Sequence, residues 1–192
     1  MAEREILQYP KYKNALRAKS APVHAFSQQT IRLIKDLKDT LLAHQDGIGL
    51  AAPQIGVRLR VVIVRLGVGN DENGEANPPI ALVNPEIIES REEHKDFDGC
   101  LSFPGLYGET VRPHFLRITG IDEIGTSFDR IFSGFDAIMV HHEIDHLEGV
   151  LFIDRIDSLD DLYRVYMDDH GTPVHVPISE ILPTARVADM AE

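Results

Sequence analysis

The sequence predicts an α+β fold: a single domain over residues 1–192, in which small antiparallel or mixed β-sheets pack around a central helix. One helix is expected before the strands and another near the C-terminus. Two observations predict this fold. The expected elements run in the order helix, strands, helix, helix, whereas an α/β protein alternates strands with helices. In addition, 192 residues with 43% apolar content suffice for one hydrophobic core. We expect the core to span about residues 5–168 and the tail at 169–192 to be irregular.

The first helix is expected from residue 27 to about residue 45. Apolar positions there recur with the 3.6-residue period of a helix: Ile31, Ile34, Leu37 or Lys38, Leu41 and Leu42. Ser27 or Thr30 can cap the first turn, and Gly47 can end the helix. The preceding residues 1–25 show no period and are expected to be irregular.

Strands are expected in the middle of the chain. After a loop of small residues at 47–54, the segment 57–64 alternates at first and then becomes fully apolar, as a buried strand does. A polar loop rich in glycine and proline is expected at 67–79. Further short strands are expected at 80–83, 86–94 and 111–122.

The second helix is expected from 133 to 147, where Ser133 and Asp136 have the spacing of a capping box. One side of this helix carries, in order, Phe135, Ile138, Met139, His142 and His146. The two histidines are therefore expected to face the core, and Gly149 can end the helix. A short strand is expected at 150–153. A last helix is expected to open at Ser158 and to carry Leu159, Leu162, Tyr163 and Tyr166.

Composition excludes several classes of protein. The net charge is −12, and no basic run is interleaved with aromatic residues, so a nucleic-acid groove is not expected. A single cysteine cannot form an internal disulfide, which favours a reducing compartment. No apolar run has the length of a membrane span, and the first ten residues lack the apolar stretch of a signal peptide. We therefore expect a cytoplasmic protein.

The most informative motif is His-Glu-Ile-Asp-His at 142–146. Two imidazoles four residues apart lie on one side of a helix, so His142 and His146 can reach one metal ion. A buried histidine is more often a structural residue than a ligand, but two adjacent buried imidazoles need partners, and a shared metal satisfies both. Glu143 would lie beside the ion. This arrangement is typical of an activated water with a carboxylate that moves its proton.

The third ligand decides which enzyme this motif belongs to. No histidine follows within the next few residues, as the extended form of a metalloprotease motif would require. Downstream candidates are few: Asp154, Asp157, His170 and His175. Upstream, Cys100 follows Gly99, which would let the backbone approach an ion closely, although an isolated cysteine is usually only a small buried hydrophobe.

Three segments together resemble the three motifs of the peptide deformylases, in the same order. They are Gly-Ile-Gly-Leu-Ala-Ala-Pro-Gln at 47–54, Asp-Gly-Cys-Leu-Ser at 98–102 and His-Glu-Ile-Asp-His-Leu at 142–147. The opening segments, Ile-Leu-Gln-Tyr-Pro at 6–10 and Ala-Pro-Val at 21–23, also resemble the start of that family. The resemblance covers about residues 5–157.

The resemblance implies a site and its chemistry. Cys100, His142 and His146 would hold one divalent metal with water in the fourth position. The ion would usually be Fe(II), with zinc, nickel or cobalt also able to bind. The Cys/His₂ set by itself would have favoured zinc. Glu143 would act as general base and then general acid. The donors to the developing oxyanion would be the side-chain amide of Gln54 and the backbone N–H of Leu101.

The resemblance also implies the substrate, the N-terminal formylmethionine of newly made polypeptides, with release of formate. The partner would be a nascent chain, with transient contact at the ribosome. Backbone groups near Ile48 and Gly49 would pair with the extended peptide, and Gly99 would lie beside it. Ile138 and Met139, with residues near 105–107, are candidates for the pocket that takes the methionine side chain.

The chain departs from the family pattern at two positions next to the motifs. Asp98 stands where the family usually has glutamate, and its expected partner is Arg112. His141 stands where the family usually has glutamine. Neither change removes a ligand, the general base or the oxyanion donor, so we expect an active enzyme. Two alternatives stay open: a zincin-like protease, and a protein that holds metal structurally or binds formylated peptides without turnover.

Overall fold

The structure of the chain, a computed structural model, describes residues 3–44, 46–68, 77–168 and 170–181. In this part of the chain seven strands form one antiparallel sheet with the order β1-β2-β3-β4-β6-β7, and β5 pairs with β4 off this path. The strands are β1 Gly49–Ala51, β2 Val61–Val64, β3 Ile80–Gly99, β4 Leu106–Ile121, β5 Ser127–Ser133, β6 Leu162–Met167 and β7 Pro173–Pro177. The fold is therefore α+β, with one curled sheet among the described strands in place of several small ones.

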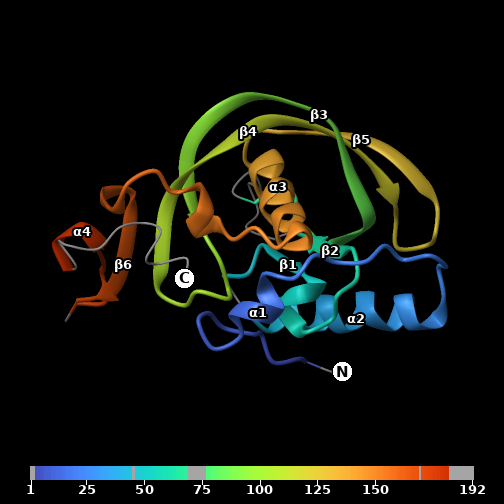
Figure 1. Cartoon of the computed structure of the whole chain (residues 1–192), viewed down its shortest axis with the longest axis horizontal. Helices are drawn as coiled ribbons and strands as arrows, with labels where there is room; N and C mark the ends of the chain where they lie inside the picture. The colour runs from blue at the N-terminus through green and yellow to red at the C-terminus, as the bar shows by residue number, and fades with distance from the viewer. Residues whose placement is uncertain (1–2, 45, 69–76, 169, 182–192) are drawn as a thin grey trace.

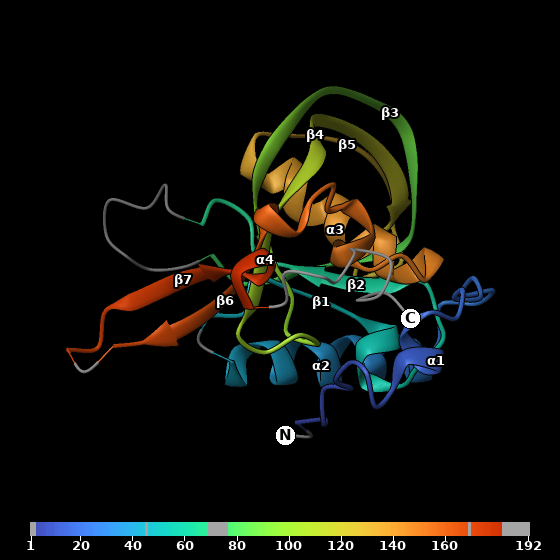
Figure 2. The same cartoon turned by 60° about the vertical axis from the view of Figure 1, so that its left-hand side comes forward.

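The long strands β3 and β4, together with β5, arch over helix α3 Phe135–Glu148 (Figures 1 and 2). Register shifts interrupt the β3–β4 pairing between Val83 and Glu86 and between Ile87 and Glu89. An extra residue in one strand bends it and increases its twist, which is what a sheet needs in order to wrap around a helix. The arch covers α3 from above and leaves it in contact with β1 and β2 below.

Strand β2 is buried on both faces, which explains its uninterrupted apolar sequence. Val61 and Ile63 pack in the cluster that contains Leu37 and Leu41 of helix α2 Gln28–Ala43. The alternate residues Val62 and Val64 pack in a second cluster with the α3 residues Ala137, Val140, Ile144 and Leu147. Helix α3 therefore lies on the opposite side of the sheet from α2, held by side chains that alternate along one short strand.

Helix α2 begins as its sequence predicts. The Ser27 hydroxyl accepts from the backbone N–H of Thr30 at 3.4 Å, and the helix ends at Ala43, with His44 as its C-cap, before Gly47 is reached. The buried side is rotated from the expected stripe, because Ile31 and Leu42 are exposed. The buried side consists of Thr30, Leu33, Ile34, Leu37, Thr40 and Leu41.

The expected start of the second helix is wrong. Ser133 does not cap α3; it is the last residue of β5, where it pairs with Phe115. The N-cap is Gly134, whose φ of 59° turns the chain from strand to helix, a conformation that glycine adopts at little cost. Asp136 instead accepts a hydrogen bond from the backbone N–H of Gly67 at 2.9 Å. Strand β5 itself was not predicted.

The C-terminal elements also differ from expectation. The predicted last helix is only a short 3₁₀ helix, η3 Leu159–Asp161, after which the chain enters β6. Leu162 pairs with Gly108, and Arg164 pairs with Leu106. This pairing with β4 favours a strand, although the local spacing of apolar residues fits a helix. The strand expected at 150–153 is absent: residues 150 and 151 lie in neither a helix nor a strand, and residues 152 and 153 begin the 3₁₀ helix η2 Phe152–Arg155.

The tail is not irregular where the structure describes it, because β7 and helix α4 Ile178–Ile181 form there; residues 182–192 lie outside the described residues.

The remaining differences from the expected elements are smaller. The expected strands at 80–83 and 86–94 are one continuous strand, β3, and the strand expected at 111–122 begins earlier, at Leu106. The 57–64 strand is shorter than expected, and the 47–54 loop contains β1 and the 3₁₀ helix η1 Ala52–Ile55. Helix α1 Lys13–Leu16 interrupts the segment expected to be irregular.

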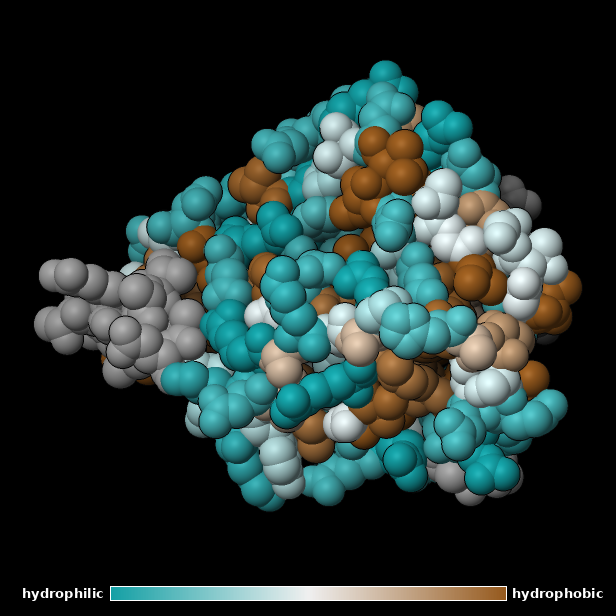
Figure 3. Space-filling model, turned by 45° about the vertical axis from the view of Figure 1, so that its right-hand side comes forward, coloured by the Kyte–Doolittle hydropathy of each residue, from teal (hydrophilic) through white to brown (hydrophobic). Residues whose placement is uncertain are grey.

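Hydrophilic residues predominate on the face shown in Figure 3, with hydrophobic groups between them. No helix among the described residues is long and apolar enough to cross a bilayer.

Candidate active site

Three possible metal ligands meet at the end of β3 and on α3. One ligand atom from each of Cys100, His142 and His146 lies within 4.8 Å of the others, and Cys100 Sγ is 3.2 Å from His146 Nε2. Both histidines are buried, as expected from the helix pattern. One thiol and two imidazole nitrogens facing a common point form a donor set suited to a divalent transition metal. The third residue of this possible ligand group is thus Cys100. The four candidates downstream in the sequence, Asp154, Asp157, His170 and His175, are not part of the group.

Asp98 orients the ring of His142 through a contact with its Nδ1 atom. His142 Nδ1 lies 2.8 Å from Asp98 Oδ1, which leaves Nε2 of the ring for the ligand position. Asp98 Oδ2 accepts from Arg112 Nε at 2.7 Å and from the Thr110 hydroxyl at 3.0 Å. The pairing expected between Asp98 and Arg112 is therefore present, even though aspartate has the shorter side chain. Burial alone would raise the pKa of Asp98, but the charges of His142 and Arg112 hold it well below its usual range.

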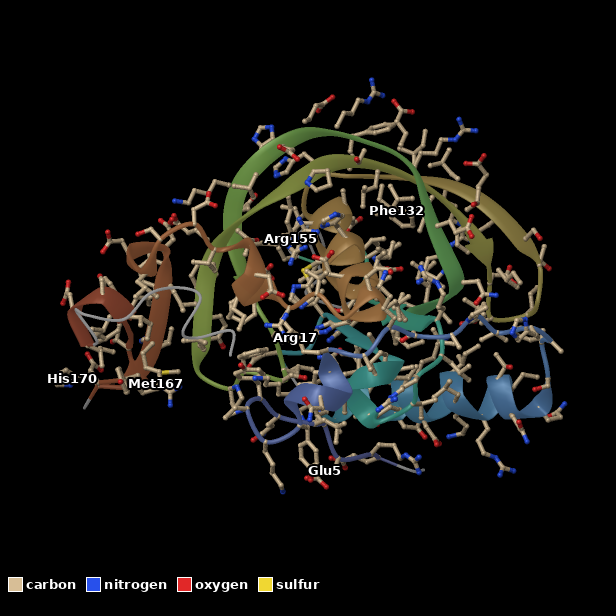
Figure 4. All side chains as sticks on the ribbon, viewed as in Figure 1. Glu5, Arg17, Phe132, Arg155, Met167 and His170 are labelled. Carbon is tan, nitrogen blue, oxygen red and sulfur yellow. The ribbon has the colours of Figure 1, made fainter. Side chains whose placement is uncertain are left out.

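Arg112 joins this carboxylate to a second one on α3. Its side chain is 0% exposed, and its Nη1 donates to Asp145 Oδ2 at 2.7 Å and to His141 Nδ1 at 2.8 Å. Arg155, from η2 beside α3 (Figure 4), also donates to Asp145, at 2.5 and 2.7 Å. Burial lowers the pKa of His141 to about 4, so the ring is neutral and can accept this hydrogen bond. His141 thus has a definite partner that sequence reasoning did not identify.

Glu143 is buried with one oxygen free of protein partners. Its side chain is 2% exposed, and Oε2 has no hydrogen-bond partner among the described residues. Burial raises the pKa of Glu143 to about 7, close to the range in which a carboxylate both accepts and returns a proton. A Cβ at Gly49 would overlap this carboxylate, so the space that Glu143 occupies depends on glycine at position 49.

Gln54 is fixed next to the thiol by its place in η1. Its Oε1 accepts from the backbone N–H of Ala51 at 2.8 Å, which directs the amide nitrogen the other way. Nε2 lies 3.2 Å from the Ser102 hydroxyl and 3.4 Å from Cys100 Sγ. The amide nitrogen of Gln54 therefore faces Cys100, a member of the histidine–cysteine group.

Gln54, Cys100, His142 and Glu143 line one cleft with a volume of about 890 Å³. Several predicted site residues line it: Ile48, Gly49, Gln54, Gly99, Cys100, Leu101, Met139, His142 and Glu143. Ile138 does not line it, because its side chain is 1% exposed and is turned into the core. Of the predicted 105–107 segment, Gly105 and Tyr107 reach the cleft.

One wall of the cleft was missed by sequence reasoning. The N-terminal segment contributes residues from Glu3 to Tyr12, although it was expected to be irregular. Its backbone is bonded to the motif segments: Leu7 N–H donates to Gln54 O at 2.7 Å, and Tyr9 N–H donates to Ser102 O at 2.9 Å. The resemblance at 6–10 was the signal that could have placed this segment at the site.

A buried glutamate beside a Cys/His/His group in a cleft is typical of a metal-dependent hydrolase. Residues 3–161 match the polypeptide deformylase family. The chain is 40% identical to peptide deformylase 1 of Bacillus cereus over 156 residues, which is 81% of this chain and 94% of that protein. It is 38% identical to peptide deformylase 1 of Bacillus subtilis over 158 residues, 82% of this chain and 92% of that protein.

Solved structures agree with this match. A peptide deformylase from Legionella pneumophila superposes with a TM-score of 0.71 at 38% identity, over 81% of this chain and 87% of that one. The Ehrlichia chaffeensis peptide deformylase in complex with actinonin superposes with a TM-score of 0.74 at 30% identity, over 82% and 90% of the two chains. The chain belongs to the polypeptide deformylase family and is an enzyme of that family. This membership, with the position of Cys100, favours a deformylase over a zincin-like protease.

Proposed function

We propose that this protein hydrolyses the formyl group from the N-terminal formylmethionine of newly made polypeptides and releases formate. The observation that carries the proposal is the buried Glu143 carboxylate, which has an oxygen without a protein partner beside the Cys100, His142 and His146 group. A structural metal site would not need a free carboxylate, since burying one without partners is unfavourable. The family match supports the same reaction.

Cys100, His142 and His146 would hold the metal, and we propose Fe(II), the ion usual in this family, with zinc, nickel or cobalt as alternatives. When bound, the ion would supply the Lewis acidity that makes water a good nucleophile near neutral pH. Asp98 would fix the ring of His142, and Arg112 would keep Asp98 charged and in place.

Glu143 would take a proton from the attacking water and deliver it to the nitrogen of the leaving amine. Water adds to the formyl carbon, the C–N bond breaks, and the products are formate and a free amino terminus. As the formyl oxygen gains negative charge, it would receive hydrogen bonds from Gln54 Nε2 and from the backbone N–H of Leu101. The fixed Ala51 contact of Gln54 supports this role, because a donor held in place needs no reorganisation during the reaction.

The peptide would lie extended along Ile48 and Gly49 and pass Gly99. Met139 lines the cleft and would contact the methionine side chain. We place this reaction on nascent chains in the cytoplasm, with transient contact at the ribosome. The bacterial origin of the relatives supports this placement.

The test is anaerobic purification, metal analysis and a formate-release assay on formyl-Met-Ala-Ser. We expect one divalent metal per chain and release of formate. Full metal loading without formate release from any formylated peptide would overturn the proposal.

Two variants separate the alternatives. Cys100→Ser should weaken metal binding, whereas a protease site that does not use this thiol would keep its metal. Glu143→Ala should retain metal and bind peptide but lose turnover, while the exposed Glu86→Ala serves as a control with normal turnover. Formate release by Glu143→Ala at the rate of the unchanged enzyme would exclude Glu143 as the proton carrier.

A further inference from the structure

The C-terminal hairpin lies outside the family match, which ends at residue 161. Strands β6 and β7 form this hairpin and project from the body of the protein (Figure 2). The hairpin is joined to the sheet beside the cleft, because Tyr107 of β4 pairs with Tyr163 of β6 and Val165 N–H donates to Gly105 O at 3.0 Å. Both Tyr107 and Gly105 line the cleft.

The strand register places an aromatic row on one face of the sheet. Gly99, Tyr107, Tyr163 and Pro177 are successive partners across β3, β4, β6 and β7. Residues two positions apart on a strand share a face, so Phe97 and His175 belong to the same face as this row. The aromatic row is therefore Phe97, Tyr107, Tyr163 and His175.

The rings of the aromatic row are in contact. Phe97 stacks on Tyr107 with centroids 5.5 Å apart and planes at 10°, and His175 lies 5.5 Å from Phe97 on a tilted plane. Tyr163 meets His175 edge to face at 6.3 Å. His175 thus contacts the Phe97–Tyr107 pair from the hairpin side, and Tyr163 contacts His175.

Gly99 connects the aromatic row to the metal ligands. A Cβ at Gly99 would come within 2.6 Å of Tyr107 Cδ1, so the ring of Tyr107 lies directly over this glycine, next to Cys100. Phe97 is 43% exposed, and Phe97, Gly99 and Tyr107 all line the cleft. The Phe97–Tyr107 pair is therefore part of the wall of the cleft.

We propose that the hairpin is a specificity element: through His175 and Tyr163 it holds the Phe97–Tyr107 pair, which packs against a large apolar or aromatic side chain of the peptide. The inference rests on the proposed deformylase function. Phe97 precedes Gly99 by two residues, about 7 Å along β3, and an extended peptide covers this span in about two residues. The side chains concerned are those of the second and third residues of the substrate. His175 acts through Phe97 and is a positioning residue.

The test compares formyl-Met-Phe-Phe with formyl-Met-Gly-Gly, with KM and kcat measured separately. We expect His175→Ala to raise KM for the phenylalanine peptide by about two- to tenfold relative to the glycine peptide, the range expected for one aromatic contact. Phe97→Ala should have the larger effect of the two, and His175→Phe should restore the preference.

His170→Ala is the matched control, because His170 lies with Met167 at the far end of the hairpin, away from α3 (Figure 4). The His170→Ala variant should have an unchanged KM for both peptides.

Equal effects of His175→Ala on the KM of both peptides, or no effect on either, would overturn the inference. If the unchanged enzyme releases no formate from either peptide, the proposed function fails. Calorimetric binding of Met-Phe-Phe and Met-Gly-Gly to the unchanged protein and to His175→Ala then decides the inference separately.

Discussion

Replacing Gly49 by alanine should inactivate the enzyme while leaving its fold and metal in place. The φ of Gly49 is not left-handed, and its pairing with Val64 uses only the backbone, so alanine is compatible with β1. The added methyl group would lie 2.7 and 2.8 Å from Cδ and Cγ of Glu143 and would overlap its carboxylate. The end of a side chain is easier to move than backbone, so Glu143 should give way.

The expected loss follows from the proposed role of Glu143 as general base. A positioned general base contributes about 10²- to 10⁴-fold, or about 3–5 kcal/mol of the activation barrier. Overpacking of the site should cost about 1–3 kcal/mol of stability, which lowers Tm by about 2–12 °C for a chain of this size. The loss of activity should therefore exceed what the loss of stability explains.

The assay is formate release at saturating formyl-Met-Ala-Ser, with metal content and thermal unfolding measured on the same preparation. Gly171→Ala is the control: a Cβ there meets nothing within 4 Å, but its φ of +78° strains alanine. This control should lose stability without losing activity. A Gly49→Ala enzyme with normal metal content and more than half of the original kcat would refute the reasoning.

Three further predictions concern residues packed around the proposed metal ligands. Arg112→Met should cost about 3–5 kcal/mol in chemical denaturation, because it leaves Asp98 and Asp145 buried without their shared partner; a loss below about 1 kcal/mol would contradict this. Asp98→Asn should weaken metal affinity by about 10- to 100-fold in a chelator competition, since it removes the charge that orients His142; unchanged affinity would show that the ring is held by other contacts. His141→Gln should be nearly neutral because its amide oxygen can accept from Arg112, whereas His141→Leu should cost about 1–3 kcal/mol; equal stability of the two variants would exclude the hydrogen bond.

Much of the candidate site could be predicted because its residues lie in short contiguous segments. The four-residue spacing of His142 and His146 predicts a shared side of a helix from local geometry alone, and the structure places both side chains in the core. Cys100 could be named only through the resemblance, since the spacing leaves several candidates for a third ligand open.

The parts that could not be predicted depend on contacts between distant residues. Leu162–Met167 has a period compatible with a helix, but pairing with β4 makes it a strand. Ser133 has the spacing of a helix cap, but pairing with Phe115 takes it into β5. Ile138 and Met139 are adjacent on one helix, and only the position of the cleft shows that Met139 reaches it and Ile138 does not. The hydrogen bonds of His141 and Arg155 to their partners carry no sequence signal.

The contacts of Arg112 affect which parts of the protein can unfold locally. One guanidinium group links Asp98 at the end of β3, its own strand β4, and two side chains of α3. Separating any of these elements breaks several charged hydrogen bonds at once in a region that excludes water. Local opening should therefore leave His142 and His146 of α3 protected, and their amide protons should exchange with solvent mainly through global unfolding.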